Sequence, residues 1–222
     1  AFDGLPTELG TTTLPEKSTI LAADGSLLAT FYDQNRVVVP LTEISPLLQH
    51  AVIATEDRRF YEHAGVDPPQ GMARAFVKNL AGQDQEGAST LTQQYVKNVL
   101  IEKALSTGTK AEQLAAVEAA KEHEGTEGGY ARKLREAKLA IALEKTMTKD
   151  QILEKYLNIA QFGASVYGAE SAAQYYFGKP AKDINYLEAA TIAGITQSPT
   201  KWDPTINPGG TRRRAATASC ST

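Results

Sequence analysis

Two short apolar runs near the N terminus predict a β-hairpin. The stretch "STILAADGSLLATF" places these runs on either side of Asp24-Gly25, a dipeptide that suits a tight hairpin turn. Three consecutive valines, Val37–Val39, indicate a third strand that the following proline ends. The pattern predicts a small β appendage over residues 18–45, after a linker rich in Pro, Thr and Gly over residues 1–17.

From Pro46 onward, the apolar positions recur with the period of an α-helix, and the first long helix is predicted over residues 46–61. Further helices are predicted from Ser89 or Thr90, over 111–124, over 130–147, after Thr148, over 168–177 and after Asn185. The sequence therefore predicts a mainly α protein over 46–208, and we find no internal repeat.

Several features refine these helices. Three of the helix starts carry a capping pair: Thr90 with Gln93, Thr148 with Gln151, and Asn185 with Glu188. The Ala, Glu and Lys-rich helix at 111–124 has loop-like flanks, which indicates an insertion near 104–129. On the helix at 130–147 we expect an inward face of Leu134, Ala137 and Ile141. Residues 209–222 are expected to form an irregular tail.

Composition narrows the class of protein. The 222 residues are 42% hydrophobic, which is ordinary for a folded globular chain. The net charge of −3 argues against a nucleic-acid partner. A single cysteine, Cys220, excludes an intrachain disulfide. No apolar run approaches the ~18 residues that a membrane span needs. Ala1 is not an initiator residue, so we expect the chain to begin part-way into a longer protein.

The first candidate for chemistry is Glu56, followed by Asp57, at the end of an apolar helix. Glu56 lies four positions after Val52 and four before Phe60, so it shares their face. A carboxylate held against apolar surface can serve as a general base or acid. The alternative is a surface carboxylate paired with one of the two arginines that follow. His63 has no metal-binding motif around it, which favours a structural role.

The stretch "GASTLTQQYVKN" joins a small-residue loop to a helix start. The first-turn amides can hold an anion. Ser89, Gln93 and Gln94 add hydrogen-bonding groups suited to sugar or phosphate oxygens. Lys97 lies one helical turn beyond Gln93 and adds positive charge. The alternative is a capped amphipathic helix with solvated polar residues.

A second cluster lies at "RKLRE". Arg132 and Glu136 are spaced i, i+4, which would give a surface salt bridge. In the functional interpretation Arg132 and Lys133 hold a phosphate and Glu136 is a second carboxylate, as in glycosyl transfer. Asn158 either lines a sugar groove or caps a helix.

Five segments occur in an order that resembles one family: "EDRRFYEHAG", "GASTLTQQYVKN", "RKLRE", "ILEKYLNIAQFG" and "AATIAGITQSPTKWDP". They are similar to the glycosyltransferase domain of class A penicillin-binding proteins and of monofunctional peptidoglycan glycosyltransferases, glycosyltransferase family 51. The resemblance covers about residues 18–208. It implies a lysozyme-like, two-lobed helical domain that polymerises lipid II into glycan strands, with inversion at C1 and release of undecaprenyl pyrophosphate.

The resemblance also implies residue roles. Glu56 matches the family's general base, and Glu136 matches the second glutamate, near the departing pyrophosphate. The matching substrate contacts are Asp57, Ser89, Gln93, Gln94, Lys97, Arg132, Lys133 and Asn158. Some family members bind Mg²⁺ or Mn²⁺ at the pyrophosphate, although no dedicated metal site is visible in the sequence.

The resemblance further implies partners and a location. The partners would be lipid II, the growing lipid-linked strand, the membrane surface, a fused transpeptidase domain and divisome or elongasome proteins. The domain would work on the outer face of the bacterial cytoplasmic membrane, anchored by an upstream transmembrane helix. Residues 66–86 would face the membrane, although an ordinary surface helix fits their pattern equally well.

Two other interpretations remain open, and a departure from the family pattern supports the second of them. Gly128 and Gly129 stand where the family has an Arg-Thr pair, unless Lys103 or Lys110 replaces that arginine. One alternative is a lysozyme-like enzyme that cleaves glycan, and the other is a catalytically silent module that binds lipid II.

Overall fold

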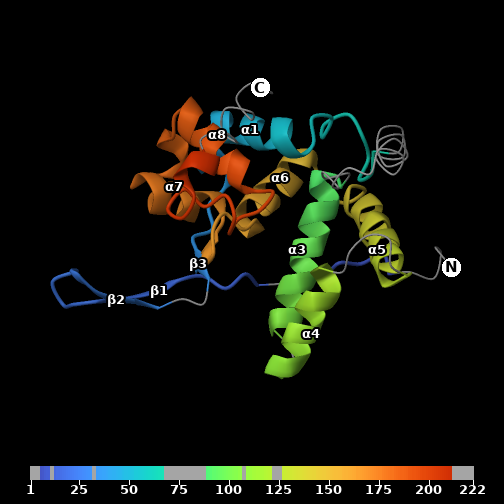
Figure 1. Ribbon diagram of the computed structural model, residues 1–222, viewed down its shortest axis with the longest axis horizontal. Helices are drawn as coiled ribbons and strands as arrows, with labels where there is room; N and C mark the ends of the chain where they lie inside the picture. Colours follow the sequence, from blue (N-terminus) through green and yellow to red (C-terminus); the bar gives the residue numbers. More distant parts are fainter. Residues whose placement is uncertain are drawn as a thin grey trace. The chain divides into compact units, whose positions relative to one another are not determined.

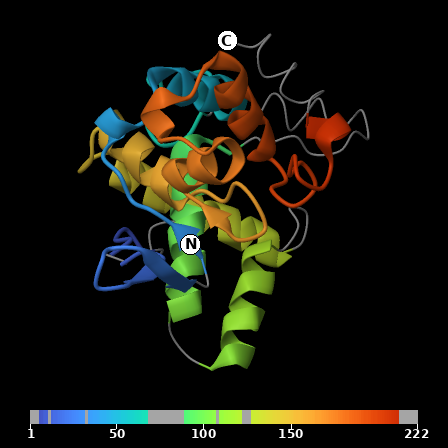
Figure 2. The ribbon, with the colours of Figure 1, turned by 90° about the vertical axis from the view of Figure 1, so that its left-hand side faces the viewer.

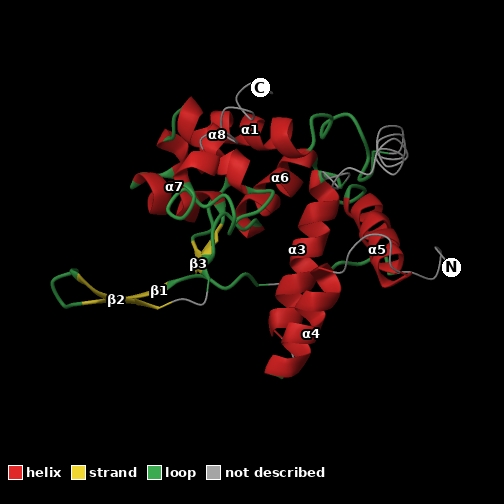
Figure 3. Ribbon diagram, in the orientation of Figure 1, coloured by secondary structure: helices red, strands yellow, loops and turns green. Residues whose placement is uncertain are grey.

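The computed structural model describes residues 6–10, 13–31, 34–67, 89–106, 109–121 and 127–211 (Figure 1). The chain divides into two compact units: Ala1–Thr12 with Glu56–Ile152 form the first, and Thr13–Thr55 with Leu153–Thr222 form the second. Helices dominate the described chain and its strands are short (Figure 3). The prediction of a mainly α domain with a small N-terminal β appendage is confirmed.

Three helices build the first unit: α3 (Leu91–Ser106), α4 (Lys110–Lys121) and α5 (Glu127–Leu143). The predicted insertion helix is α4, which packs against α3 (Figures 1 and 2). Val96 of α3 and Leu139 and Ala140 of α5 form a buried apolar cluster. This cluster joins the two helices that carry the candidate polar residues.

The inward face of α5 differs from the predicted one. Leu134 is 51% exposed, whereas Leu139 and Ala140 are buried. The buried stripe starts at Glu136, because Leu139, Ala140 and Leu143 follow it at i+3, i+4 and i+7. Apolar residues alone therefore do not identify the inward face of α5, because one of its buried positions is Glu136.

Part of the predicted linker packs onto the first unit. Leu9 lies against the α3–α5 cluster, and its backbone carbonyl accepts a hydrogen bond from the ammonium of Lys103. The segment around Leu9 therefore adds apolar contact and a polar tie to this pair of helices. Lys103, considered from the sequence as a replacement for a missing arginine, has this structural partner.

The second unit contains the predicted hairpin. β1 (Ser18–Leu21) pairs antiparallel with β2 (Leu27–Phe31) around the turn at Asp24-Gly25. The Asp24 carboxylate accepts a hydrogen bond from the Ser26 amide at 2.9 Å, which closes the turn locally. The predicted hairpin with its turn at Asp24-Gly25 is confirmed.

The third strand lies earlier than predicted. β3 is Asn35–Arg36 and runs parallel to β4 (Val166–Tyr167), while Val37–Val39 is extended but unpaired with any strand of the described chain. The amide of Val39 donates instead to the side chain of Asn158 at 2.9 Å. A side chain thus takes the place of a neighbouring strand.

The remaining elements are η1 (Leu41–Glu43), α1 (Pro46–Glu56), α6 (Lys149–Ile159), α7 (Ala169–Phe177), η2 (Ala181–Asp183) and α8 (Tyr186–Ile195). All three predicted capping pairs form, at the starts of α3, α6 and α8. Helix α1 ends at Glu56 rather than at residue 61, because the chain turns after that residue. The first residues of the predicted tail are helical at 208–211, and the residues beyond 211 lie outside the described chain.

Gly65 permits a close approach between the first motif and α5. Its φ of +79° is a conformation that side chains disfavour. A Cβ at this position would lie 2.8 Å from the backbone carbonyl of Ala140. The Gly65 carbonyl accepts a hydrogen bond from the Thr90 hydroxyl at 2.7 Å. One glycine therefore allows the loop, α3 and α5 to meet.

Gly65→Ala tests this contact. We expect the free energy of unfolding to fall by about 2–4 kcal/mol, because a left-handed residue and an overpacked backbone contact both cost stability. Gly25→Ala is the matched control: its φ is +84°, but nothing lies within 4 Å of the added Cβ. It should lose only about 1–2 kcal/mol in urea unfolding. Equal losses in the two variants would contradict the clash.

Candidate active site

The segment after α1 is fixed by a buried aromatic ring. Phe60 is fully buried, and the ammonium of Lys149 lies 4.5 Å from its ring centroid. The neighbouring Tyr61 hydroxyl donates to the Asp150 carboxylate at 3.0 Å. Burial, together with this carboxylate, raises the pKa of Tyr61 to about 12, so the phenol stays a donor. Lys149 and Asp150 thus hold the turn that follows Glu56.

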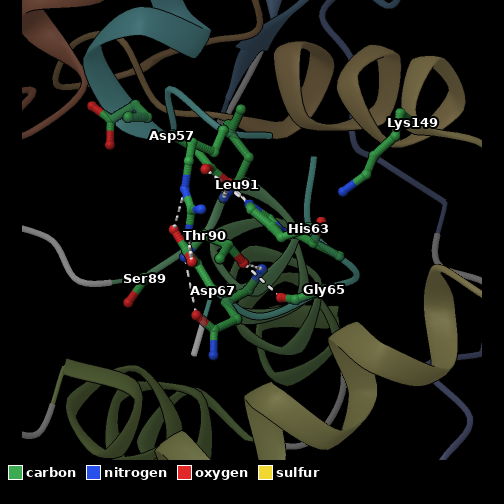
Figure 4. Close-up of polar contacts among 12 residues, drawn as sticks. Asp57, His63, Gly65, Asp67, Ser89, Thr90, Leu91 and Lys149 are labelled. Atoms are coloured by element: carbon green, nitrogen blue, oxygen red, sulfur yellow. Dashed lines mark hydrogen bonds and ion pairs between the residues drawn. The ribbon is translucent and has the colours of Figure 1, made fainter. Parts of the chain in front are cut away.

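Asp57 is buried and has polar contacts with several residues of the site. Figure 4 shows these contacts. Both carboxylate oxygens of Asp57 lie 2.9 Å from His63 Nε2. The same carboxylate accepts the backbone N–H of Leu91, the first residue of α3, at 3.0 Å. The structural role expected for His63 is borne out, because the ring partners Asp57 within the first unit. Among the described residues, no group of three His, Cys, Asp or Glu side chains is placed to hold a metal.

The carboxylate of Asp57 occupies the start of α3, where the sequence led us to expect a substrate anion. The backbone N–H of Gln93 donates to the Thr90 hydroxyl at 3.2 Å. The backbone N–H of Thr90 donates in turn to the side-chain oxygen of Gln93 at 3.0 Å. The Leu91 amide is taken by Asp57. These first-turn amides, expected from the sequence to face a substrate anion, are engaged by the chain itself. The Leu91 amide ties the second motif to the first, whereas those of Thr90 and Gln93 close the helix cap.

Glu56 therefore emerges beside α3. Its carboxylate accepts a hydrogen bond from the Gln94 side-chain amide at 2.9 Å, and both residues are half-buried. Arg59, which was one of the two arginines expected to pair with Glu56, instead contacts both carboxylate oxygens of Asp67 with its guanidinium group. The Gln94 side-chain amide thus holds one Glu56 oxygen in a fixed orientation, which suits a proton acceptor.

Glu136 is a buried carboxylate surrounded by cations. It is only 1% exposed, so the surface salt bridge considered from the sequence does not describe it. Arg132 donates to one of its oxygens at 2.6 Å, and the ammonium of Lys133 lies 3.7 Å from the other. Lys133 also donates to the hydroxyl of Ser89. Because burying a carboxylate is costly unless it is paired, Arg132 and Lys133 are the partners that offset the burial of Glu136.

These contacts bring the sequence-predicted residues of three motifs together in the first unit. Glu56 ends α1 and Asp57 follows it, Ser89, Gln93, Gln94 and Lys97 lie at or in α3, and Arg132, Lys133 and Glu136 lie in α5. The arrangement offers a carboxylate with an oriented oxygen and a cationic group on the neighbouring helix. It suits the transfer of a group from an anionic leaving group.

The comparisons with known proteins agree with this geometry. A family model described as transglycosylase matches residues 24–219. The chain belongs to the transglycosylase family. The match extends beyond residue 208, so it includes most of the stretch that the sequence suggested was an irregular tail.

The similar proteins include penicillin-binding proteins of two bacteria. The chain is 38% identical over 191 residues to penicillin-binding protein 1A of Neisseria lactamica, covering 86% of this chain and 21% of the relative. It is 36% identical over 205 residues to penicillin-binding protein 1F of Bacillus subtilis strain 168, covering 92% of this chain and 25% of the relative. The chain thus spans about a quarter or less of the length of these relatives.

One expected site residue of this transglycosylase lies in the other unit. Asn158 is buried, its amide nitrogen donates to the carbonyls of Val39 and Glu154, and its oxygen accepts from the Val39 amide. Both ends of the side chain are thus used to hold an extended segment. Of the two roles predicted for Asn158, capping a helix is closer to this observed role than lining a sugar groove.

Two further expectations of the resemblance concern other parts of the chain. Gly128 and Gly129, which stand where the resemblance leads us to expect an Arg-Thr pair, lie in the first turn of α5. Lys110, the other candidate replacement, is the exposed first residue of α4. The predicted membrane-facing stretch 66–86 lies outside the described residues except for Val66 and Asp67.

Sequence reasoning missed two residues of this transglycosylase site. Gly65 was read only as part of a motif, although a glycine directly after His63-Ala64 signalled a special backbone position. Glu144 accepts from the Thr92 hydroxyl at 2.5 Å and from Lys149 at 2.8 Å, which ties α3 to the start of α6. No local pattern marks Glu144, because its partner on α3, Thr92, lies 52 positions away in the sequence.

Asp57→Ala tests the central carboxylate. We expect the free energy of unfolding to fall by about 2–4 kcal/mol, because the Leu91 amide and the His63 ring both lose a buried partner. Asp57→Asn keeps an acceptor for the amide and should lose less. Urea-induced unfolding measures both.

Glu43→Ala is the matched control for the loss of an ion pair. Glu43 pairs with Lys182 where both side chains are about half-exposed, 47% and 50%. Exposed pairs contribute little to stability, so this variant should unfold at the parent midpoint. An Asp57→Ala variant as stable as Glu43→Ala would remove Asp57 from its central role.

Proposed function

We propose that this chain is the peptidoglycan glycosyltransferase domain of a penicillin-binding protein, which joins lipid II units into glycan strands. The observation that carries the proposal is the Glu56–Gln94 hydrogen bond of 2.9 Å, in the same unit as the Arg132, Lys133 and Glu136 cluster. The relatives named penicillin-binding proteins 1A and 1F support the same function.

Glu56 acts as the general base in this proposal. It takes the proton of the 4-hydroxyl on the incoming lipid II sugar, and that oxygen forms a bond to C1 of the growing chain. The bond between C1 and the pyrophosphate oxygen breaks, and undecaprenyl pyrophosphate leaves with the electron pair. Attack from the opposite face inverts the anomeric centre from α to β. Gln94 keeps the Glu56 carboxylate in one orientation, which favours the proton transfer.

The cations act on the leaving group. Negative charge grows on the pyrophosphate as its bond to C1 breaks, and fixed cations stabilise that charge most strongly in a partly dehydrated site. Arg132, Lys133 and Lys97 are the residues proposed for this role. Glu136 keeps the two α5 cations together, because its buried carboxylate attracts both.

A divalent cation fits this site only with help from the substrate. The described residues offer no cluster of three or more ligating side chains, and Glu136 is already occupied by arginine and lysine. Mg²⁺ commonly binds through substrate phosphates with few protein carboxylates. Mg²⁺ or Mn²⁺ would therefore be bound mainly by pyrophosphate oxygens, and would supply further charge neutralisation there.

The proposed substrate carries a lipid, which places the reaction at a membrane surface. We propose the outer face of the bacterial cytoplasmic membrane as the location, with an anchoring helix and a transpeptidase domain in the full protein. Proteins of the divisome or elongasome would be partners of that full protein. None of the described helices is both long and apolar enough to cross a membrane.

Glu56→Gln tests the base. The glutamine keeps the shape and can keep the contact with Gln94, but it cannot accept the proton. We expect polymerisation of fluorescent lipid II, followed on a gel, to fall by about 10²- to 10⁴-fold. Glu62→Gln is the control, since Glu62 is exposed in the turn that follows α1. Near-normal turnover of Glu56→Gln would overturn the assignment.

Two further measurements beside the polymerisation assay separate the rival functions. A lysozyme-like enzyme would release reducing ends from purified cell wall and would make no polymer. A silent binding module would bind a lipid II analogue without turnover.

Lys97→Ala tests the cationic site. Moenomycin is a phosphoglycolipid that resembles the donor in this family. Because a lost charge-assisted contact is worth about 1.5–3 kcal/mol, we expect its dissociation constant to rise about 10- to 100-fold. Lys145→Ala is the control, because Lys145 is exposed in the turn after α5. Unchanged affinity in Lys97→Ala would remove Lys97 from the site.

A further inference from the structure

Lys133 is shared between a neutral and a charged partner. Its ammonium donates to the Ser89 hydroxyl and lies 3.7 Å from a Glu136 oxygen, beyond ordinary hydrogen-bond distance. Arg132 contacts the other oxygen of the same carboxylate at 2.6 Å. Glu136 thus has one tightly bound cation and one that is held further away.

Ser89 is itself held by the residues around Glu56. Its backbone carbonyl lies 3.5 Å from the Gln94 amide nitrogen, which also donates to Glu56 at 2.9 Å. The next residue, Thr90, is fixed by the Gly65 carbonyl and by its capping pair. Ser89 therefore contacts Gln94 through its backbone carbonyl and Lys133 through its hydroxyl.

The strengths of these two partners differ. A hydrogen bond from an ammonium to a carboxylate is roughly twice as strong as one between neutral groups, and a buried carboxylate attracts a cation strongly. The Ser89 hydroxyl competes with the second oxygen of Glu136 for the ammonium of Lys133, and without this hydroxyl the ammonium would lie closer to that oxygen. In that position a phosphate oxygen would have to compete with a carboxylate for the ammonium protons, whereas a hydroxyl is displaced more readily.

We propose that Ser89 is a positioning residue that keeps the ammonium of Lys133 off Glu136 and available to an anionic diphosphate. This inference rests on the proposed function only for the identity of the diphosphate as the leaving group. Ser89 acts through Lys133, which differs from the direct substrate contact that the family resemblance implies.

A double-mutant cycle with moenomycin as the probe tests the inference. Ser89→Ala should raise the dissociation constant, measured by fluorescence anisotropy, by about 5- to 10-fold, the value of one hydrogen bond. Lys133→Met should raise it by about 10- to 100-fold. The double variant should bind no more weakly than Lys133→Met, because Ser89 has no effect once the ammonium is gone.

Ser89→Thr is the conservative variant, since it keeps the hydroxyl. It should bind moenomycin as the parent chain does, and this rescue separates the hydroxyl from a general effect on folding. If Ser89→Ala weakens binding equally with and without Lys133, Ser89 contacts the ligand directly and the inference is overturned. An unchanged dissociation constant in Ser89→Ala overturns it as well.

The outcome is distinguishable from that of the proposed function. Coupling between Ser89 and Lys133 in a parent chain that binds moenomycin but makes no glycan ladder would support the inference and contradict the proposed function. A normal ladder of glycan strands without coupling between Ser89 and Lys133 would support the proposed function and contradict the inference.

Discussion

The buried carboxylate of Asp57 is the interaction on which the candidate site depends. It accepts the first amide of α3 and contacts the ring of His63, so one side chain joins two motifs that are 34 positions apart. A buried charge without these partners would be strongly unfavourable, which makes the arrangement specific. Glu56 is the neighbour of Asp57, and its place beside Gln94 follows from this junction.

A second constraint is electrostatic and lies on α5. Glu136 occupies an inward position that would ordinarily be apolar, and Arg132 and Lys133 compensate its charge. The result is a cationic group whose location is set by a buried anion rather than by a flexible surface. This explains how long arginine and lysine side chains can present charge in a defined place, although each alone has considerable rotamer freedom.

The structure also separates positioning from chemistry among residues that look alike in the sequence. Gln93 and Gln94 are adjacent, yet the oxygen of Gln93 is used to cap α3, whereas the amide of Gln94 contacts Glu56. The helical rotation of about 100° between neighbours sends their side chains in different directions. Asn158, although it belongs to a motif, holds the extended segment at Val39 in the second unit.

The sequence by itself determined the mainly α class, the hairpin at Asp24-Gly25 and the three capping pairs, because turns and caps depend on residues within a few positions of each other. The order of five motifs likewise indicated the family. Only the tertiary structure decided that Asp57 fills the helix start, that α5 turns Glu136 rather than Leu134 inward, and that Lys133 meets Ser89. Each of these depends on segments brought together by packing, and no local pattern records which polar groups a buried interface will pair.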